Sequence, residues 1–147
     1  MNDKIIFLDF DGVITNYESG FRLNPDKLAL LGKIIEATDC RLVISSSWRC
    51  HDVPATIAVL SNEKDYYNNG MKFPFCDRII GVTEQISFAK RGEEIEKWIK
   101  DNNYTGRYVI IDDMDMMLKE QKPHLVLTDF WKGLTEKDVK KTIKILQ

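Results

Sequence analysis

The chain has 147 residues, enough for one domain with a hydrophobic core, and 44% of them are hydrophobic and 30% charged, as in ordinary globular proteins. Its 21 basic and 23 acidic side chains leave a net charge of −2, so bulk charge does not attract it to nucleic acid or to a membrane. The three cysteines lack metal-site spacing, and no stretch has the length and hydrophobicity of a signal peptide or a membrane span. We therefore expect a single cytoplasmic domain over residues 1–147, with free thiols and no membrane association.

The first half of the chain predicts two buried strands with a helix between them. A continuous apolar run followed by acids predicts a strand over 4–9. Asn24 supplies an N-cap and Pro25 the first helical position, so a helix should run from there to about Thr38. The next apolar run predicts a strand over 41–45, which ends in hydroxyl side chains.

The middle of the chain is less regular. A short helix should follow Pro54, but residues 61–77 combine polar and aromatic side chains with turn-forming glycine and proline, and they predict an irregular excursion. A third strand is predicted over 78–83. The segment 91–102 then has acids in its first turn and apolar residues on one face, which predicts an amphipathic helix.

Two short strands and a helix complete the chain. Apolar runs predict strands over 108–111 and 125–127, and Thr135 with Asp138 resembles a capping box at the start of the last helix. Apolar strands that alternate with helices predict an α/β domain, with a five-stranded, mainly parallel sheet covered by helices on both faces. Such sheets bind ligands beyond the carboxyl ends of their strands, which is where the acids and hydroxyls of this chain lie.

The first predicted strand leads into two carboxylates, Asp9 and Asp11, followed by Gly12. Side chains two apart on an extended chain point to the same side, so both carboxylates can face one substrate. Asp9 can then attack phosphorus, while Asp11 protonates the leaving oxygen and later deprotonates water. Gly12 lets the backbone approach a phosphate closely. The alternative is an acidic turn without chemistry, since Asp-Gly is a common turn pair.

A second acidic pair, Asp112 and Asp113, follows the fourth predicted strand. Together with Asp9 and Asp11 it would place four carboxylates at one sheet edge, where like charges raise their pKa values unless a cation lies among them. Oxygen ligands and phosphate chemistry both favour Mg²⁺, so we expect these four residues to form a magnesium site. The alternative is an Asp-rich loop that caps the strand.

Candidate phosphate ligands follow the second strand and begin the helix over 91–102. The hydroxyls of Ser45 and Ser46 can bind phosphoryl oxygens, and Arg49 can reach a second phosphate or the body of the substrate. A cation from the pair Lys90-Arg91 would neutralise the phosphate and the nucleophile. We favour Arg91, which starts the helix, and keep Lys90 as the alternative. The alternative is that the serines form an ordinary turn between strand and helix, and that Lys90 and Arg91 are a solvated basic pair without a role in binding.

Four segments in this order, FLDFDG, VISSSWR, KRG and VIIDD, resemble the four motifs of the haloacid dehalogenase (HAD) superfamily. The resemblance spans nearly the whole chain, and it implies a Rossmann-like fold and a Mg²⁺-dependent phosphatase that forms an aspartyl-phosphate. The roles it implies are nucleophile for Asp9, acid/base for Asp11, phosphate ligand for Ser45 and for Arg91 or Lys90, and magnesium ligand for Asp112 with Asp113. In the superfamily the residue that matches Asp11 offers the metal its backbone carbonyl.

Two shorter strings, SSSWR and RGEEI, are similar to the phosphatase modules of bacterial RNA-repair proteins, which resemble polynucleotide 3′-phosphatases. The stretches from Gly12 to Asn24 and from Thr83 to Lys90 are too short for the cap of many superfamily members, so we expect a site without a large cap. An open site suits a phosphate at the end of an RNA or DNA strand, because a large substrate can itself exclude water.

The aromatic residues of the irregular excursion have two interpretations. Tyr66, Tyr67, Phe73 and Phe75 could stack on bases, but we prefer the interpretation that they form a separate hydrophobic cluster.

Three other functions compete with a nucleic-acid phosphatase. One is a general phosphatase for small molecules or phosphoproteins, and another is a non-catalytic phosphate-binding module. The third is a receiver-type phosphoacceptor, which needs an acceptor Asp at the end of the third strand, where this chain has Ile80-Gly81-Val82-Thr83. No protein partner is predicted.

Overall fold

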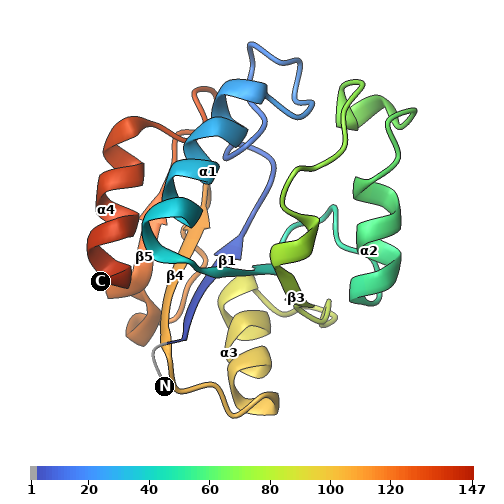
Figure 1. Cartoon of the computed structure of the whole chain (residues 1–147). Helices are drawn as coiled ribbons and strands as arrows, with labels where there is room; N and C mark the ends of the chain where they lie inside the picture. Colours follow the sequence, from blue (N-terminus) through green and yellow to red (C-terminus); the bar gives the residue numbers. More distant parts are fainter. Residues whose placement is uncertain (1–2) are drawn as a thin grey trace.

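The computed structural model describes residues 3–147, and at its centre lies a five-stranded sheet (Figure 1). The strands are β1 (Lys4–Leu8), β2 (Arg41–Ile44), β3 (Ile79–Val82), β4 (Arg107–Asp112) and β5 (Leu125–Leu127). Neighbouring strands all run parallel, in the order β3-β2-β1-β4-β5. The predicted α/β fold is confirmed. This order is that of Rossmann-type folds, whereas receiver domains have the order 2-1-3-4-5, so the topology argues against a receiver.

The helices begin and end close to where local sequence signals predict them. They are α1 (Pro25–Thr38), α2 (Val53–Leu60), α3 (Arg91–Asp101) and α4 (Glu136–Leu146). The Asn24 side chain caps α1 by accepting a hydrogen bond of 2.9 Å from the Asp26 N–H. Thr135 and Asp138 exchange hydrogen bonds at the start of α4, so the predicted capping box is confirmed.

Apolar side chains of β1 alternate between the two faces of the sheet. Ile6 and Leu8 belong to the core that packs against α1 and α4. Ile5 and Phe7 lie on the opposite face, in a second core that includes Ile95 of α3. Figure 1 shows α1 beside α4 on one side of the sheet and α3 on the other. Helices therefore cover both faces, as predicted.

The edge of the sheet beyond the strand ends is not covered by an inserted domain. Residues 9–24 and 83–90, where a cap would be inserted, contain no helix and no strand longer than an isolated bridge. The domain therefore has no large cap.

The irregular excursion over 61–77 contributes both core and surface. Phe73 is 2% exposed and joins the main core, against which Phe75 also packs. The preferred interpretation of a separate hydrophobic cluster is therefore wrong for these two residues, because the segment folds back onto the core, where Phe75 lies next to Gly32 of α1. Tyr66 and Tyr67, by contrast, are 67% and 55% exposed.

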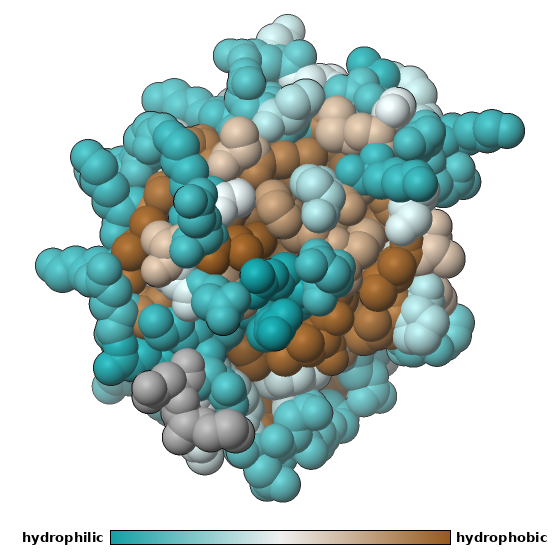
Figure 2. All heavy atoms as spheres, viewed as in Figure 1, coloured by the Kyte–Doolittle hydropathy of each residue, from teal (hydrophilic) through white to brown (hydrophobic). Residues whose placement is uncertain are grey.

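The surface mixes hydrophilic and apolar side chains. On the face in Figure 2, hydrophilic residues project around the outline, and hydrophobic residues are visible between them. The exposed large aromatic side chains include Tyr17, Tyr66 and Trp131, each more than half exposed. Within residues 3–147, no helix combines the length and the apolar character needed to cross a membrane.

Candidate active site

Three predicted site residues, Asp9, Ser45 and Asp112, lie side by side at the carboxyl ends of β1, β2 and β4. Backbone hydrogen bonds of 3.0 Å from Asp9 to Ile111 and from Ser45 to Leu8 continue the parallel pairing beyond β1. They set Asp9 between Ser45 and Asp112. The chain leaves β1 towards β2 and leaves β4 towards β5, in opposite directions, so Asp9 lies at the topological switch point where α/β sheets bind ligands.

Three carboxylates converge at this point. One oxygen from each of Asp9, Asp112 and Asp113 lies within 4.8 Å of the others. Arg91, the first residue of α3, contacts two of them: its Nη1 is 3.0 Å from Asp9 Oδ1 and 2.8 Å from Asp112 Oδ2. Lys90 is exposed at the N-cap position of the same helix. Of the two basic residues considered, the geometry thus brings Arg91 to the carboxylates.

The cluster carries more negative charge than its arginine offsets. Burial and the neighbouring Asp112 raise the pKa of Asp9 to about 9, although Arg91 opposes the shift. Burial also raises the pKa of Asp112. With all three carboxylates ionised, the cluster would carry two negative charges beyond the one guanidinium, and a divalent cation would balance them and so favour the ionised forms. Because the donor set consists only of oxygens, Asp9, Asp112 and Asp113 fit a Mg²⁺ ion.

The two predicted serines differ in what their hydroxyls do. Both residues are buried. Ser45 Oγ, level with Asp9, has no hydrogen-bond partner among residues 3–147. Buried polar groups are almost always hydrogen-bonded, so a phosphoryl oxygen would supply the missing partner. Ser46 Oγ instead accepts a hydrogen bond of 3.1 Å from the Trp48 N–H, and its hydroxyl shapes the loop after β2.

Arg49 lies beside the site but is engaged by the protein itself. Its Nη1 donates to the Ser46 carbonyl at 2.7 Å, and its Nη2 pairs with Glu94 Oε1 at 3.2 Å. The Arg49 and Glu94 side chains are only 7% and 8% exposed, so most of the charge of Arg49 is neutralised within the fold. The pair joins the loop after β2 to α3. A contact between Arg49 and substrate stays a prediction.

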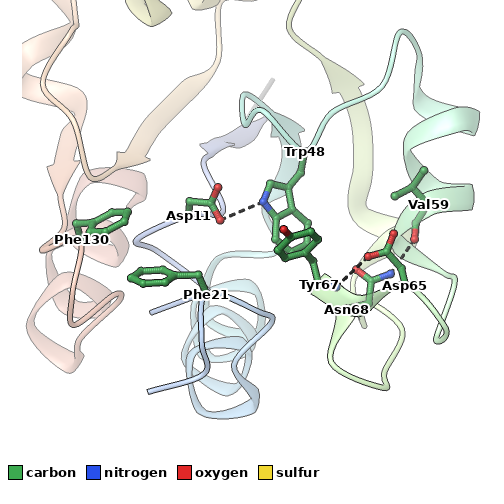
Figure 3. Close-up of a pocket in the computed structure, with 8 residues that line it drawn as sticks. All are labelled: Asp11, Phe21, Trp48, Val59, Asp65, Tyr67, Asn68 and Phe130. Atoms are coloured by element: carbon green, nitrogen blue, oxygen red, sulfur yellow. Dashed lines mark hydrogen bonds between the residues drawn. The ribbon is translucent and has the colours of Figure 1, made fainter. Parts of the chain in front are cut away.

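Asp11 is not one of the three clustered carboxylates. Its Oδ1 accepts a hydrogen bond of 3.1 Å from Trp48 Nε1 (Figure 3). The same oxygen accepts one of 3.3 Å from Thr15 Oγ1. The sequence predicted a cluster of four carboxylates, and the structure brings three together. The alternation that would align Asp11 with Asp9 holds only for extended chain, and here the chain turns directly after β1. Asp11 instead lines a cavity beside the site.

Gly12 is required by the turn itself. Its φ is +77°, and a Cβ at this position would lie 2.9 Å from Asp113 Cβ and 3.0 Å from Phe130 Cα. Thr128 Oγ1 donates a hydrogen bond of 2.6 Å to the Gly12 carbonyl. The glycine thus lets Asp113 approach the turn, and a close approach of phosphate to the Gly12 backbone stays a prediction.

Gly12→Ala should therefore lower both stability and activity. A left-handed backbone costs a non-glycine residue about 1–3 kcal/mol, and the clash with Asp113 adds to this and displaces a carboxylate of the cluster. Chemical denaturation measures the first effect and phosphate release the second. Gly70→Ala is the matched control, since Gly70 has a φ of +75° but no atom within 4 Å of the added Cβ. Equal loss of stability in the two variants would contradict the close packing at Gly12.

Some residues that shape the site carry no sequence pattern. Gln121 is 1% exposed; it donates to the Gly92 carbonyl and accepts from the Leu118 N–H, each at 2.9 Å, and so anchors the first turn of α3. A single glutamine in a polar segment gives no such indication. The tryptophan of the SSSWR string offered one clue, because a partly buried indole N–H needs an acceptor, which here is Asp11.

The chain was compared with known proteins in three ways. A family model described as "HAD domain in Swiss Army Knife RNA repair proteins" matches residues 5–139. This range contains four strands and all of β1 except Lys4, and it includes every candidate site residue named above. Neither the comparison with curated proteins nor the comparison with solved structures found a match.

Proposed function

Since the chain belongs to the family of HAD domains in Swiss Army Knife RNA repair proteins, we propose that it is a Mg²⁺-dependent phosphatase that removes the terminal phosphate of an RNA or DNA strand. The observation that carries this proposal is the buried Asp9 carboxylate, which lies 3.0 Å from Arg91. The backbone register sets it beside Ser45, whose hydroxyl has no hydrogen-bond partner within the described part of the chain. In this proposal Asp9 is the nucleophile, and Arg91 and the Ser45 hydroxyl bind phosphoryl oxygens beside it.

In the first proposed step, a carboxylate oxygen of Asp9 attacks phosphorus and forms an aspartyl-phosphate. The bond between phosphorus and the leaving oxygen breaks, and Asp11 gives its proton to that oxygen, which departs as a hydroxyl group of the nucleic acid. The position of Asp11 supports this role, since Trp48 and Thr15 hold its carboxylate outside the acidic cluster and beside a cavity.

In the second step, the Asp11 carboxylate takes a proton from water, and the water oxygen attacks phosphorus. Inorganic phosphate leaves, and the Asp9 carboxylate is restored. Arg91 and Ser45 would bind phosphoryl oxygens throughout. A Mg²⁺ ion bound by Asp9, Asp112 and Asp113 would supply positive charge that offsets the charges of phosphate and carboxylates.

The open site and the family together support a nucleic-acid end as the substrate. A domain without a large cap leaves a small substrate exposed to water, whereas the end of a strand can cover the site. The net charge of −2 gives no strong long-range attraction, so we expect binding to be weak and salt-sensitive.

The test is phosphate release from a short 3′-phosphorylated RNA oligonucleotide, a mononucleotide 3′-phosphate and a phosphopeptide, each with Mg²⁺ and with chelator. We expect the highest kcat/KM on the oligonucleotide and loss of activity in chelator. Ca²⁺ should inhibit, because it takes more ligands at longer distances than Mg²⁺. Asp112→Asn should abolish activity or raise the Mg²⁺ concentration that it requires.

Each other outcome selects a different function. Equal rates on the three substrates would reduce the activity to that of a general phosphatase, and a preference for the phosphopeptide would indicate a phosphoprotein phosphatase. Full activity in chelator would refute the role of the metal. Binding of phosphate without turnover of any substrate would favour a non-catalytic module.

A further inference from the structure

A cavity of about 480 Å³ lies beside Asp11, within the range of small-ligand sites, which is roughly 300–1,000 Å³. Figure 3 shows Phe21 and Phe130 on one side of Asp11 and Trp48 with Tyr67 on the other. These four aromatic residues come from four separate segments of the chain. Two aromatic walls therefore flank the proposed acid/base.

The rings of each wall support one another. Phe21 and Phe130 stack with their centroids 4.8 Å apart and their planes inclined by 20°. Trp48 and Tyr67 meet edge to face at 5.9 Å, and the hydrogen bond of 3.1 Å to Asp11 holds the indole. A flat ligand would meet rings that are already in place, so little side-chain entropy would be lost on binding.

Aromatic surface around the cavity is left exposed to solvent. Tyr67 and Phe130 are 55% and 39% exposed, and their ring neighbours Tyr66 and Trp131 are 67% and 60% exposed. Contiguous exposed apolar surface commonly marks a binding site. The guanidinium of Arg22 lies 4.9 Å from the centre of the Tyr66 ring and adds positive charge near this surface, which suits a ligand that carries phosphates.

The position of Asp11 connects this cavity to the proposed reaction. A proton donor must lie within reach of the leaving oxygen, so the leaving group of a phosphate bound at Asp9 begins at Asp11. The same residue lines the aromatic cavity. For a terminal phosphate on a nucleic acid, the leaving group is a sugar that carries a base.

We propose that this cavity binds the nucleobase of the terminal nucleotide by stacking on its aromatic walls. The proposal rests on the proposed phosphatase function and adds the feature of the substrate that the protein recognises. Every base has a π-face, so stacking tolerates all four bases. The base must also be free of its complement to enter, so the substrate is a single-stranded end.

The test compares two single-stranded oligonucleotides with a 3′-phosphate that differ only in the last nucleotide, which carries a base in one and is abasic in the other. Loss of one stacked base should lower kcat/KM about 5- to 140-fold, mainly through KM. Placing the base-bearing end in a blunt duplex should lower kcat/KM as well.

Variants assign the effect to the cavity. Phe130→Ala and Tyr67→Ala should each shrink the preference for the base-bearing over the abasic oligonucleotide. If Phe130→Ala does not fold, Phe130→Leu replaces it in the same measurement, because leucine keeps apolar volume but has no ring to stack on a base. Phe88→Ala is the matched control, because Phe88 is fully exposed and does not line the cavity; it should keep the parental preference.

The outcomes separate this proposal from the phosphatase function itself. Equal kcat/KM on the two oligonucleotides would overturn the cavity proposal and leave the phosphatase intact. Faster turnover of a phosphotyrosine peptide than of the base-bearing oligonucleotide would also overturn it, with an aromatic side chain as the occupant. If neither oligonucleotide is hydrolysed, the phosphatase function fails. Equilibrium binding then tests the cavity, and equal affinity for the two would overturn that proposal too.

Discussion

Asp9→Asn should abolish phosphate release, by a factor on the order of 10⁴ or more, and leave the fold intact. The amide is nearly the size and shape of the carboxylate, but it lacks the charge and the basicity needed to attack phosphorus. Single-turnover phosphate release measures the loss. Beryllium fluoride should bind at Asp9 in the parent as a mimic of the aspartyl-phosphate, and it should not bind in the variant.

The same substitution should stabilise the protein when Mg²⁺ is removed. Burial and Asp112 raise the pKa of Asp9 to about 9, so the folded protein holds this proton more tightly than the unfolded chain does. The parent therefore loses stability as the pH rises towards that value. Asn does not titrate, so the advantage of the variant in free energy of unfolding should grow between about pH 5 and pH 8 in chelator.

Asp115→Asn is the control for both effects. Asp115 is an exposed acid in the loop after β4, where it pairs with Lys122. This contact lowers the pKa of Asp115, so its replacement should change neither phosphate release nor the slope of stability against pH between about pH 5 and pH 8. If Asp9→Asn released phosphate at close to the parental rate, Asp9 could not be the nucleophile.

Arg91→Ala should lower kcat by about 10²–10³, the effect of removing one charged or hydrogen-bonding group that stabilises a transition state. Arg91 Nη1 contacts both Asp9 and Asp112, at 3.0 Å and 2.8 Å. Its loss would leave these buried carboxylates without their cation and remove the nearest positive side chain from the phosphate. Steady-state kinetics at saturating Mg²⁺ measure the effect.

Arg91→Lys keeps the charge but not the planar guanidinium, so it should lose less activity than the alanine variant and remain folded if that variant does not. Lys90→Ala should lose far less activity than Arg91→Ala, because Lys90 is exposed. The opposite ranking would transfer the role to Lys90, and two mild losses would leave the basic pair without a catalytic role.

The sequence by itself determined the α-helices and strands and their bounds to within one or two residues. Asn24 with Pro25, and Thr135 with Asp138, act on backbone groups within a few positions, so helix starts could be predicted from local signals. Apolar runs predicted the five strands. Because parallel strands end at one edge, the positions of Asp9 and Asp112 behind two of those runs sufficed to predict a shared site.

Only the tertiary structure decided how the side chains at that edge are arranged. Asp11 was grouped with three other acids, but Trp48 and Thr15 hold its carboxylate elsewhere. Arg49 was predicted to reach the substrate, and the structure also pairs it with Glu94. Each of these contacts depends on the exact turn of a loop or on the packing of a helix, which no short-range pattern encodes.

The strand order and the aromatic cavity also depend on contacts between segments that are far apart in the chain. The order β3-β2-β1-β4-β5 follows from how crossovers pack on the two faces of the sheet. The cavity assembles from Phe21, Trp48, Tyr67 and Phe130, which are far apart in the chain and meet only because the sheet and its loops bring them there. Residues whose role depends on such distant neighbours are recognised only once the chain is folded.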